Sequence, residues 1–358
     1  MFTFKNKQIS LTFVFILNIS ENQHCMKLSW KREILYLKET FSIAHGKYNF
    51  RETLVVMLAS HGETGYGECV AIDYYGIDLD VFVLKLHEIK QEIESAPMVV
   101  PQDFYTFLTT LNLHSFLSSA LDCAYWDLFG KLENKSFFQL NDLNGNLPES
   151  SFTISVSPVE EQVRKILASP WQNFKVKCNG LNRADIFKLL ETGKEIALDS
   201  NTSFSEDDCR FLQENELTKN FVYIEQPRPV GEYRILNKNL YANWMADEDC
   251  QDISYLEKLR PHYSAINVKL MKCGGLTPAL ELIREARKLK FKVMIGCMTE
   301  SSVGISAGIA LAPLCDYADL DGANLISNDF SEGSSVENGR LLLSEKPGLG
   351  ISMRKTNN

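Results

Sequence analysis

The sequence has little of what metal-thiolate, redox and nucleic-acid-binding proteins require. Its nine cysteines are scattered and never spaced C-x-x-C, so a structural zinc site or a dithiol redox centre is excluded. It also lacks an excess of positive charge, because its formal net charge is -9. A surface of this sign repels phosphate backbones, and we expect no nucleic acid among its partners. The cysteines are interpreted as reduced core thiols, which favours a cytoplasmic location.

No apolar run is long enough to cross a bilayer, and we expect no membrane insertion. The longest candidate lies in residues 1–25, where Lys5 and Lys7 precede an apolar run over 9–19 that resembles a signal-peptide core. No small-residue cleavage site follows it. Residues 1–25 are therefore either a targeting segment, which leaves export open, or a mis-started segment ahead of Met26.

The rest of the 358-residue chain divides into two patterns. Residues 26–147 show strand-like stretches, including 53–59 and 64–69, followed by helical spacing over 78–132, which predicts an N-terminal α+β domain. Residues 148–328 alternate short apolar strands with amphipathic helices, which is typical of a parallel α/β barrel. The eight predicted strands are 152–156, 174–178, 195–199, 221–225, 244–248, 265–270, 292–297 and 317–321. We expect 329–358 to pack back on the first domain.

Charged residues close most of these strands. In a parallel barrel the carboxyl ends of the strands form the active face, so such residues are candidates for chemistry. Asp199, Glu225 and Asp247 end three successive strands, 26 and 22 residues apart. Three neighbouring carboxylates repel one another unless a cation lies among them, and oxygen ligands alone favour Mg²⁺. The alternative is that each acid is a solvated strand end. Asp247 is preferred to Asp249, which should lie in the following loop.

Lysines occupy the strand ends on both sides of these acids. Lys175 and Lys177 lie two apart on one strand, so both should point inward and lower each other's pKa, as a general base requires. Lys269 ends the strand on the opposite side of the barrel, so a proton could be removed on one face and returned on the other. The alternative is that these lysines only pair with the carboxylates. Lys272 lies beyond its strand and is expected to meet solvent.

These motifs resemble the enolase superfamily, its muconate-lactonizing-enzyme subgroup and, within it, the dipeptide epimerases typified by L-Ala-D/L-Glu epimerase. The resemblance covers 26–353 and rests on the K-V-K, D-S-N, I-E-Q-P, A-D-E and N-V-K-L-M-K-C-G-G motifs, with G-C-M-T-E-S and D-L-D-G for the dipeptide branch. It implies a modified TIM barrel of the β7α type with an N-terminal α+β capping domain.

The resemblance also implies the site residues. Asp199, Glu225 and Asp247 would bind one Mg²⁺ per subunit, and the Mg²⁺ would bind the carboxylate of a dipeptide and stabilise an enolate. Lys177 and Lys269 would be the acid/base pair, with Lys175 in support. Asp319 and Asp321 would receive the ammonium group of the substrate. The remaining predicted substrate contacts are Thr153, Met298 and Lys47.

The resemblance predicts a 1,1-proton transfer at the alpha carbon of the C-terminal residue of a dipeptide, with L-Ala-D/L-Glu as the expected substrate and cell-wall peptide recycling as its setting. Lys47 or Arg51 could meet a glutamate side chain, whereas Tyr48, Tyr74 and Tyr75 could line an apolar pocket. The alternatives are an N-acylamino acid racemase, an o-succinylbenzoate synthase or a muconate cycloisomerase, whose substrates lack the ammonium group, and a non-catalytic barrel scaffold. The oligomeric state stays open, a homo-oligomer included.

Overall fold

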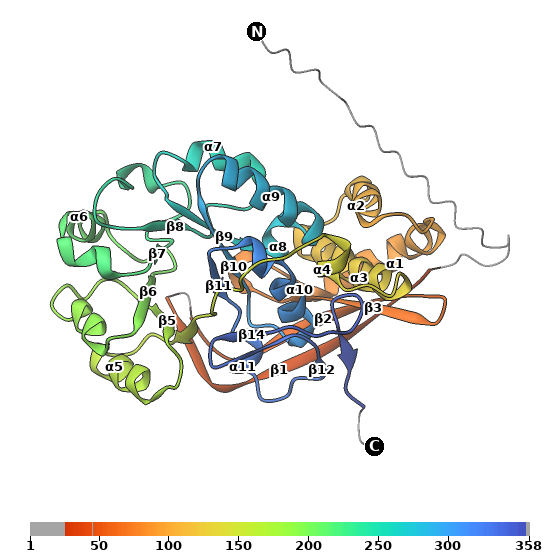
Figure 1. Cartoon of the computed structure of the whole chain (residues 1–358), viewed down its shortest axis with the longest axis horizontal. Coiled ribbons are helices and arrows are strands. Elements are labelled where there is room, and N and C mark those ends of the chain that lie inside the picture. The colour runs from red at the N-terminus through yellow and green to blue at the C-terminus, as the bar shows by residue number, and fades with distance from the viewer. Residues whose placement is uncertain (1–25, 45, 356–358) are drawn as a thin grey trace, which may run out of the picture.

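A computed structural model describes residues 26–44 and 46–355, so the targeting segment or mis-start considered for 1–25 lies outside the described residues. The chain forms a capping lobe and a barrel, with a C-terminal segment between them (Figure 1). No helix in the described ranges combines the length and the apolar character needed to cross a membrane.

The capping lobe is an antiparallel sheet covered by helices. Strand β1 (Lys27–Ile43) pairs with β2 (Gly46–Ser60), which pairs with β3 (Glu63–Val70). The helices are α1 (Leu79–Ser95), α2 (Pro101–Thr110), α3 (Ser115–Leu132) and α4 (Phe137–Leu140), preceded by the 3₁₀ turn η1 (Asp73–Tyr75). Helix α3 is buried around most of its circumference, because one side packs on β2 and β3 and another meets the barrel elements α8 and α9. It therefore joins the two lobes.

The barrel contains all eight predicted strands, each parallel to its neighbours. They are β4 (Phe152–Ile154), β5 (Asn173–Lys177), β6 (Glu195–Asp199), β7 (Ile224–Glu225), β8 (Trp244–Ala246), β9 (Ala265–Lys269), β10 (Lys292–Gly296) and β11 (Tyr317–Asp319). An isolated parallel bridge between Ser150 and Ala318 joins the first and last strands. The predicted α/β barrel with a capping domain is confirmed, and several strands are shorter than predicted.

The connections are short, which explains how eight units fit into about 170 residues. The α-helices are α5 (Val159–Ala168), α6 (Glu206–Glu214), α7 (Leu256–Leu259), α8 (Leu270–Cys273), α9 (Leu276–Lys288), α10 (Ser302–Leu311) and α11 (Gly322–Leu325). The 3₁₀ turns are η2 (Ile186–Thr192), η3 (Glu216–Asn220), η4 (Tyr233–Ile235), η5 (Ile253–Tyr255) and η6 (Ala312–Leu314). The connection between β5 and β6 thus has only a 3₁₀ turn where a standard barrel has a helix.

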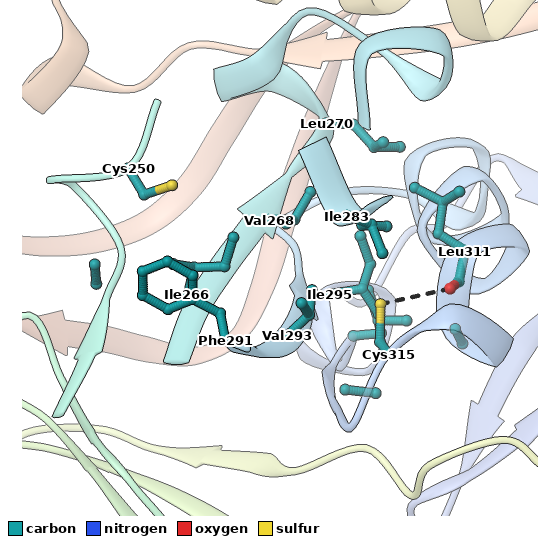
Figure 2. Close-up of a cluster of buried hydrophobic side chains, with 14 of the residues drawn as sticks. Cys250, Ile266, Val268, Leu270, Ile283, Phe291, Val293, Ile295, Leu311 and Cys315 are labelled. Atoms are coloured by element: carbon teal, nitrogen blue, oxygen red, sulfur yellow. Dashed lines mark hydrogen bonds between the residues drawn. The ribbon is translucent and has the colours of Figure 1, made fainter. Parts of the chain in front are cut away.

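The main core lies between the barrel strands and their outer helices. Figure 2 shows part of it, where Val268 and Ile295 of adjacent strands pack beside Ile283 of α9. Cys315 belongs to this cluster, and its Sγ donates a 3.5 Å hydrogen bond to the carbonyl oxygen of Leu311. The eight cysteines in the described ranges are free thiols.

The C-terminal segment forms two small antiparallel pairs and contacts the capping lobe. The pairs are β12 (Ser331–Glu332) with β15 (Ser352–Met353) and β13 (Ser335–Glu337) with β14 (Arg340–Leu342). Asp127 of α3 accepts a 2.8 Å hydrogen bond from the Leu349 amide, and Lys131 donates to the Ile351 carbonyl at 3.0 Å. The segment is thus tied to the helix that joins both lobes.

The joint between α3 and α9 depends on one glycine. Gly275 precedes α9 with φ +131°, a region that residues with a Cβ rarely adopt. Asp122 of α3 accepts hydrogen bonds from the amide and hydroxyl groups of Thr277 at 2.9 and 2.8 Å, which satisfies the start of α9. A Cβ on Gly275 would lie 2.4 Å from the Asp122 carboxylate, so only glycine permits this approach.

We therefore expect Gly275→Ala to lower the free energy of unfolding by about 3 kcal/mol or more, from backbone strain plus overlap. Gly180→Ala is the matched control, because Gly180 also has a positive φ, +74°, but no atom lies within 4 Å of its added Cβ. Its expected loss is only ~1–2 kcal/mol. Urea unfolding of both variants tests this, and equal losses would show that the contact with Asp122 is unimportant.

Candidate active site

The charged strand ends meet at the mouth of the barrel, where the capping lobe covers them. The pocket there is lined on the barrel side by Thr153, Lys175, Lys177, Lys269, Asp319 and Asp321, together with Asn201, Asp247, Glu248, Cys297, Met298, Thr299 and Leu325. The capping lobe contributes Phe41, Ile43, Arg51, Ile72, Tyr74 and Tyr75. Asp199 and Glu225 are fully buried and lie outside this lining.

Asp247 follows β8 directly and has a different partner for each carboxylate oxygen. Its Oδ1 accepts a hydrogen bond from Lys272 Nζ at 2.6 Å, and its Oδ2 accepts one from Lys269 Nζ at 2.7 Å. Burial opposes ionisation of this group, but the two ammonium groups outweigh it and hold the pKa of Asp247 well below its usual range. Asp247 is therefore a buried anion whose Oδ1 is fixed by the protein.

Asp199 and Glu225 follow the same pattern. Asp199 Oδ1 accepts from the amide of Asn201 at 2.9 Å, while its Oδ2 faces Lys177 Nζ at 2.5 Å. Glu225 Oε1 accepts from the Asn267 side-chain amide at 2.6 Å, while its Oε2 is buried without a hydrogen-bond partner. Burial raises the pKa of Glu225 to about 7. Each of the three acids thus has one oxygen fixed and one oxygen turned toward a lysine.

This donor set fits a hard cation. Lys175 Nζ lies 3.7 Å from Asp199 Oδ2 and 3.5 Å from Glu225 Oε2, so these two oxygens share one small space. In the described ranges no three His, Cys, Asp or Glu groups already stand close enough to hold a metal, since ammonium groups separate the inward oxygens. The unpartnered Glu225 oxygen and the all-oxygen chemistry fit Mg²⁺, once the flexible lysine stems turn aside.

Lys177 and Lys269 approach this space from β5 and β9, which are separated by three strands in the eight-stranded barrel and therefore lie on opposite sides. Both line the pocket. The sequence predicted that Lys175 and Lys177 lower each other's pKa, which is wrong for Lys175; the pKa of Lys269 is raised as well. Burial lowers the pKa of each, but the carboxylates around them, Asp319 foremost for Lys175 and Asp247 for Lys269, outweigh it and raise the pKa. Pairing with carboxylates, considered as an alternative, is present in this structure.

Asp319 and Asp321 both reach the pocket but have different partners. Asp319 forms an ion pair with Lys175, and its Oδ1 accepts a 2.9 Å hydrogen bond from the Ser151 hydroxyl. Asp321 accepts a 2.7 Å hydrogen bond from the Thr153 amide, and burial raises its pKa to about 7. Among the residues that the structure describes, none forms an ion pair of this kind with Asp321, so it is the better placed of the two to meet a cationic group.

The capping lobe places Arg51, rather than Lys47, at the pocket. Lys47 is exposed and lines a separate cleft, four residues or about 13 Å along β2 from Arg51. The prediction that Lys47 binds substrate is therefore not supported by its position. Arg51 is only 7% exposed, lines both cavities and stacks its guanidinium carbon 3.6 Å from the centre of the Tyr48 ring.

Several site residues were not predicted. Lys272 is buried against Asp247 rather than in solvent, because the short helix α8 turns its side chain back beneath the strand ends. Glu248 lines the pocket beside Asp247, since β8 ends at Ala246 and strict alternation stops there. Asn267 orients Glu225. Only the alternation of Asn267 and Lys269 on one strand could have indicated that both point inward.

Comparisons with known proteins agree with this geometry. Residues 159–357 match the family described as enolase C-terminal domain-like. An L-Ala-D/L-amino acid epimerase from a Maribacter species is 36% identical over 92% of this chain and 100% of its own length. The chain belongs to the dipeptide epimerases of the enolase superfamily.

A second relative in this family is the L-Ala-D/L-Glu epimerase of Bacteroides thetaiotaomicron, 31% identical over 91% of this chain and 88% of its own length. The fold matches the crystal structure of a dipeptide epimerase from Methylococcus capsulatus complexed with Mg and L-Arg-D-Lys. That match has a TM-score of 0.82 and 26% identity, and it covers 91% of this chain and 99% of the other. Family membership and barrel fold are thus established together. The roles of individual residues stay predictions.

Proposed function

We propose that this protein is a Mg²⁺-dependent epimerase that interconverts L-Ala-L-Glu and L-Ala-D-Glu. The observation that carries the proposal is the placement of Lys177 and Lys269 on opposite sides of three buried carboxylates, in one pocket closed by the capping lobe. Inversion of a carbon centre needs a base on one face and an acid on the other. Two lysines in this arrangement meet that need.

Asp199, Glu225 and Asp247 would hold the Mg²⁺. When bound, the ion would act as a Lewis acid on the substrate carboxylate and so make the proton on the neighbouring alpha carbon more acidic. One lysine, as the neutral amine, removes the alpha proton of the second residue, and the opposite lysine, as the ammonium, donates a proton to the other face. Lys175 places a further positive charge near the developing negative charge. Reaction in the reverse direction exchanges the roles of the two lysines.

The position of Asp321 favours a dipeptide substrate over an N-acyl or aromatic acid. Its carboxylate lies in the pocket wall and suits the terminal ammonium group of a dipeptide. A substrate without that cation would leave Asp321 with the Thr153 amide but no cationic partner.

The direct test incubates the full chain with Mg²⁺ and, separately, L-Ala-L-Glu, N-acetyl-L-Glu and N-succinyl-L-Glu, with chiral chromatography of the products. Inversion of the dipeptide supports the proposal, whereas inversion of the acylated acids alone contradicts it.

Arg51 supports an acidic side chain on the second residue. Burial lowers the pKa of its guanidinium, and its Nε has no hydrogen-bond partner. Among the described residues no carboxylate forms an ion pair with Arg51: Tyr48 stacks on it and accepts from it, and Asp73 attracts it only at longer range. A buried cation without a direct ion pair is costly, and a substrate carboxylate offsets that cost.

We expect Arg51→Met to lower kcat/KM for L-Ala-L-Glu about 10–100-fold, because one charge-assisted hydrogen bond is lost. The kcat/KM for L-Ala-L-Met should stay within about threefold of the wild-type value. Lys47→Met is the matched control and should leave kcat/KM unchanged for both dipeptides. Steady-state kinetics with both dipeptides decide this. Equal losses for both dipeptides in Arg51→Met would rule out a role in selecting the acidic side chain.

We further infer a reducing, cytoplasmic setting, since the cysteines in the described ranges are free thiols. Recycling of cell-wall peptides would then be the natural source of a dipeptide that contains both an L-alanine and a D-glutamate residue.

A further inference from the structure

Lys272 is one of the most completely enclosed charged groups in the barrel. It lies on α8, three residues after Lys269, and its side chain is 1% exposed. Its ammonium group donates to Asp247 Oδ1 at 2.6 Å, to the Asp247 carbonyl oxygen at 2.5 Å and to the Asn267 carbonyl oxygen at 3.0 Å. An ammonium has three N–H donors, and these three acceptors use all of them.

This arrangement separates Lys272 from Lys269, although both contact Asp247. Lys269 lines the pocket and faces Asp247 Oδ2, the inward oxygen. Lys272 does not line the pocket and holds Oδ1 together with the backbone of the same residue. Lys272 thus lacks both the access and a spare donor that a proton carrier for the substrate would need.

We propose that Lys272 is a positioning residue that fixes Asp247 so that Oδ2 alone is presented to the cation. This inference rests on the proposed function, because it assigns Asp247 to Mg²⁺. Its physical basis is that partners of a metal ligand orient the ligand and limit its motion. The Asn267 side chain does the same for Glu225 through Oε1. Lys272 differs from it in carrying a charge, which also offsets the burial of the Asp247 anion.

A matched control exists elsewhere in the chain. Lys131 of α3 also donates to one carboxylate and two carbonyl oxygens, those of Asp127 at 2.6 Å, Thr64 at 2.7 Å and Ile351 at 3.0 Å. It lies at the joint of the capping lobe and the C-terminal segment and does not line the pocket. Lys272→Met and Lys131→Met therefore each remove three matching hydrogen bonds, one set beside a proposed metal ligand and one far from it, with the Lys131 side chain 13% exposed against 1% for Lys272.

The experiment compares the full chain with Lys272→Met, Lys272→Gln and Lys131→Met by calorimetric titration with Mg²⁺ alone, after circular dichroism and thermal unfolding have shown that each is folded. We expect Lys272→Met to weaken Mg²⁺ binding about 10–100-fold and Lys131→Met to stay within about threefold of the wild-type chain. Both variants should lose thermal stability. Saturating Mg²⁺ should restore less of it in Lys272→Met, because stabilisation by a ligand follows its affinity.

Unchanged Mg²⁺ affinity in Lys272→Met would overturn the proposal and leave Lys272 with a structural role alone. If that variant fails to fold, Lys272→Gln, which keeps two donors without the charge, takes its place with an expected loss of about tenfold. Because the readout is metal binding without substrate, it is separate from the dipeptide assay. If Lys272→Met binds Mg²⁺ more weakly but the wild-type chain does not turn over the dipeptide, the proposed function is wrong and the positioning role of Lys272 is still supported.

Discussion

Replacing Lys269 by alanine lowers epimerisation of L-Ala-L-Glu by about 10³-fold or more, because one of the two faces of the substrate loses its proton carrier. Lys269 reaches the pocket from β9 and is 2.7 Å from Asp247 Oδ2, whereas Lys177 reaches it from β5. The remaining lysine still removes a proton from the epimer whose alpha hydrogen points toward it. The variant therefore exchanges that proton with solvent in only one of the two epimers.

Proton NMR in D₂O measures this exchange separately for L-Ala-L-Glu and L-Ala-D-Glu. Lys177→Ala should show the opposite preference, which makes the two variants controls for each other. Lys288→Ala serves as a further control, because Lys288 is exposed at the end of α9 and its one ion pair within the described part of the chain is with Glu285. Equal exchange of both epimers by Lys269→Ala would show that one base serves both faces.

Replacing Glu225 by glutamine is expected to weaken Mg²⁺ binding about 100-fold and to abolish measurable epimerisation. Glutamine keeps the shape and can still accept the 2.6 Å hydrogen bond from Asn267, but it removes the charge of a fully buried group. Oxygen ligands of Mg²⁺ in such sites are chiefly carboxylates, so the neutral amide is a poor substitute. Calorimetric titration with Mg²⁺ and the chiral assay measure both effects.

The fold of this variant should be intact. Without Mg²⁺, its midpoint in urea near pH 7 should equal or exceed that of the wild-type chain, because burial raises the pKa of Glu225 to about 7 and so favours the uncharged form that glutamine resembles. Glu191→Gln, on an exposed turn of the barrel, controls for the loss of one negative charge. A Glu225→Gln protein that binds Mg²⁺ as tightly as the wild-type chain would remove Glu225 from the metal site.

The barrel and the main site residues were predictable because they follow the repeat of the fold. Lys177, Asp199, Glu225, Asp247 and Lys269 each close or directly follow a strand, one strand-helix unit apart, and the structure brings them to one mouth. An error of one residue in a single strand would not have moved the other four. This is why the positions of the proposed metal ligands and lysines at the barrel mouth could be predicted from spacing and strand pattern.

The residues that were misplaced depend on the directions of side chains after the strands end. Lys272 follows β9 by three residues, and its burial depends on the path of α8. Choosing between Lys47 and Arg51 required the path of β2 over the barrel mouth, since the two lie on one strand. The pairing of Asp319 with Lys175 joins β11 and β5, which are far apart in the sequence and flank β4 in the closed barrel. None of these is encoded in a local pattern.

Deuterium incorporation shows whether this chain moves a proton at the alpha carbon of the second residue of a dipeptide. The purified chain is incubated with Mg²⁺ and L-Ala-L-Glu in D₂O, and the products are separated by chirality and examined by mass spectrometry. We expect one deuterium at the alpha carbon of the glutamate in the L-Ala-D-Glu formed, and no exchange after chelation of Mg²⁺. Unlabelled, uninverted dipeptide recovered from a folded, Mg²⁺-bound protein would contradict this expectation.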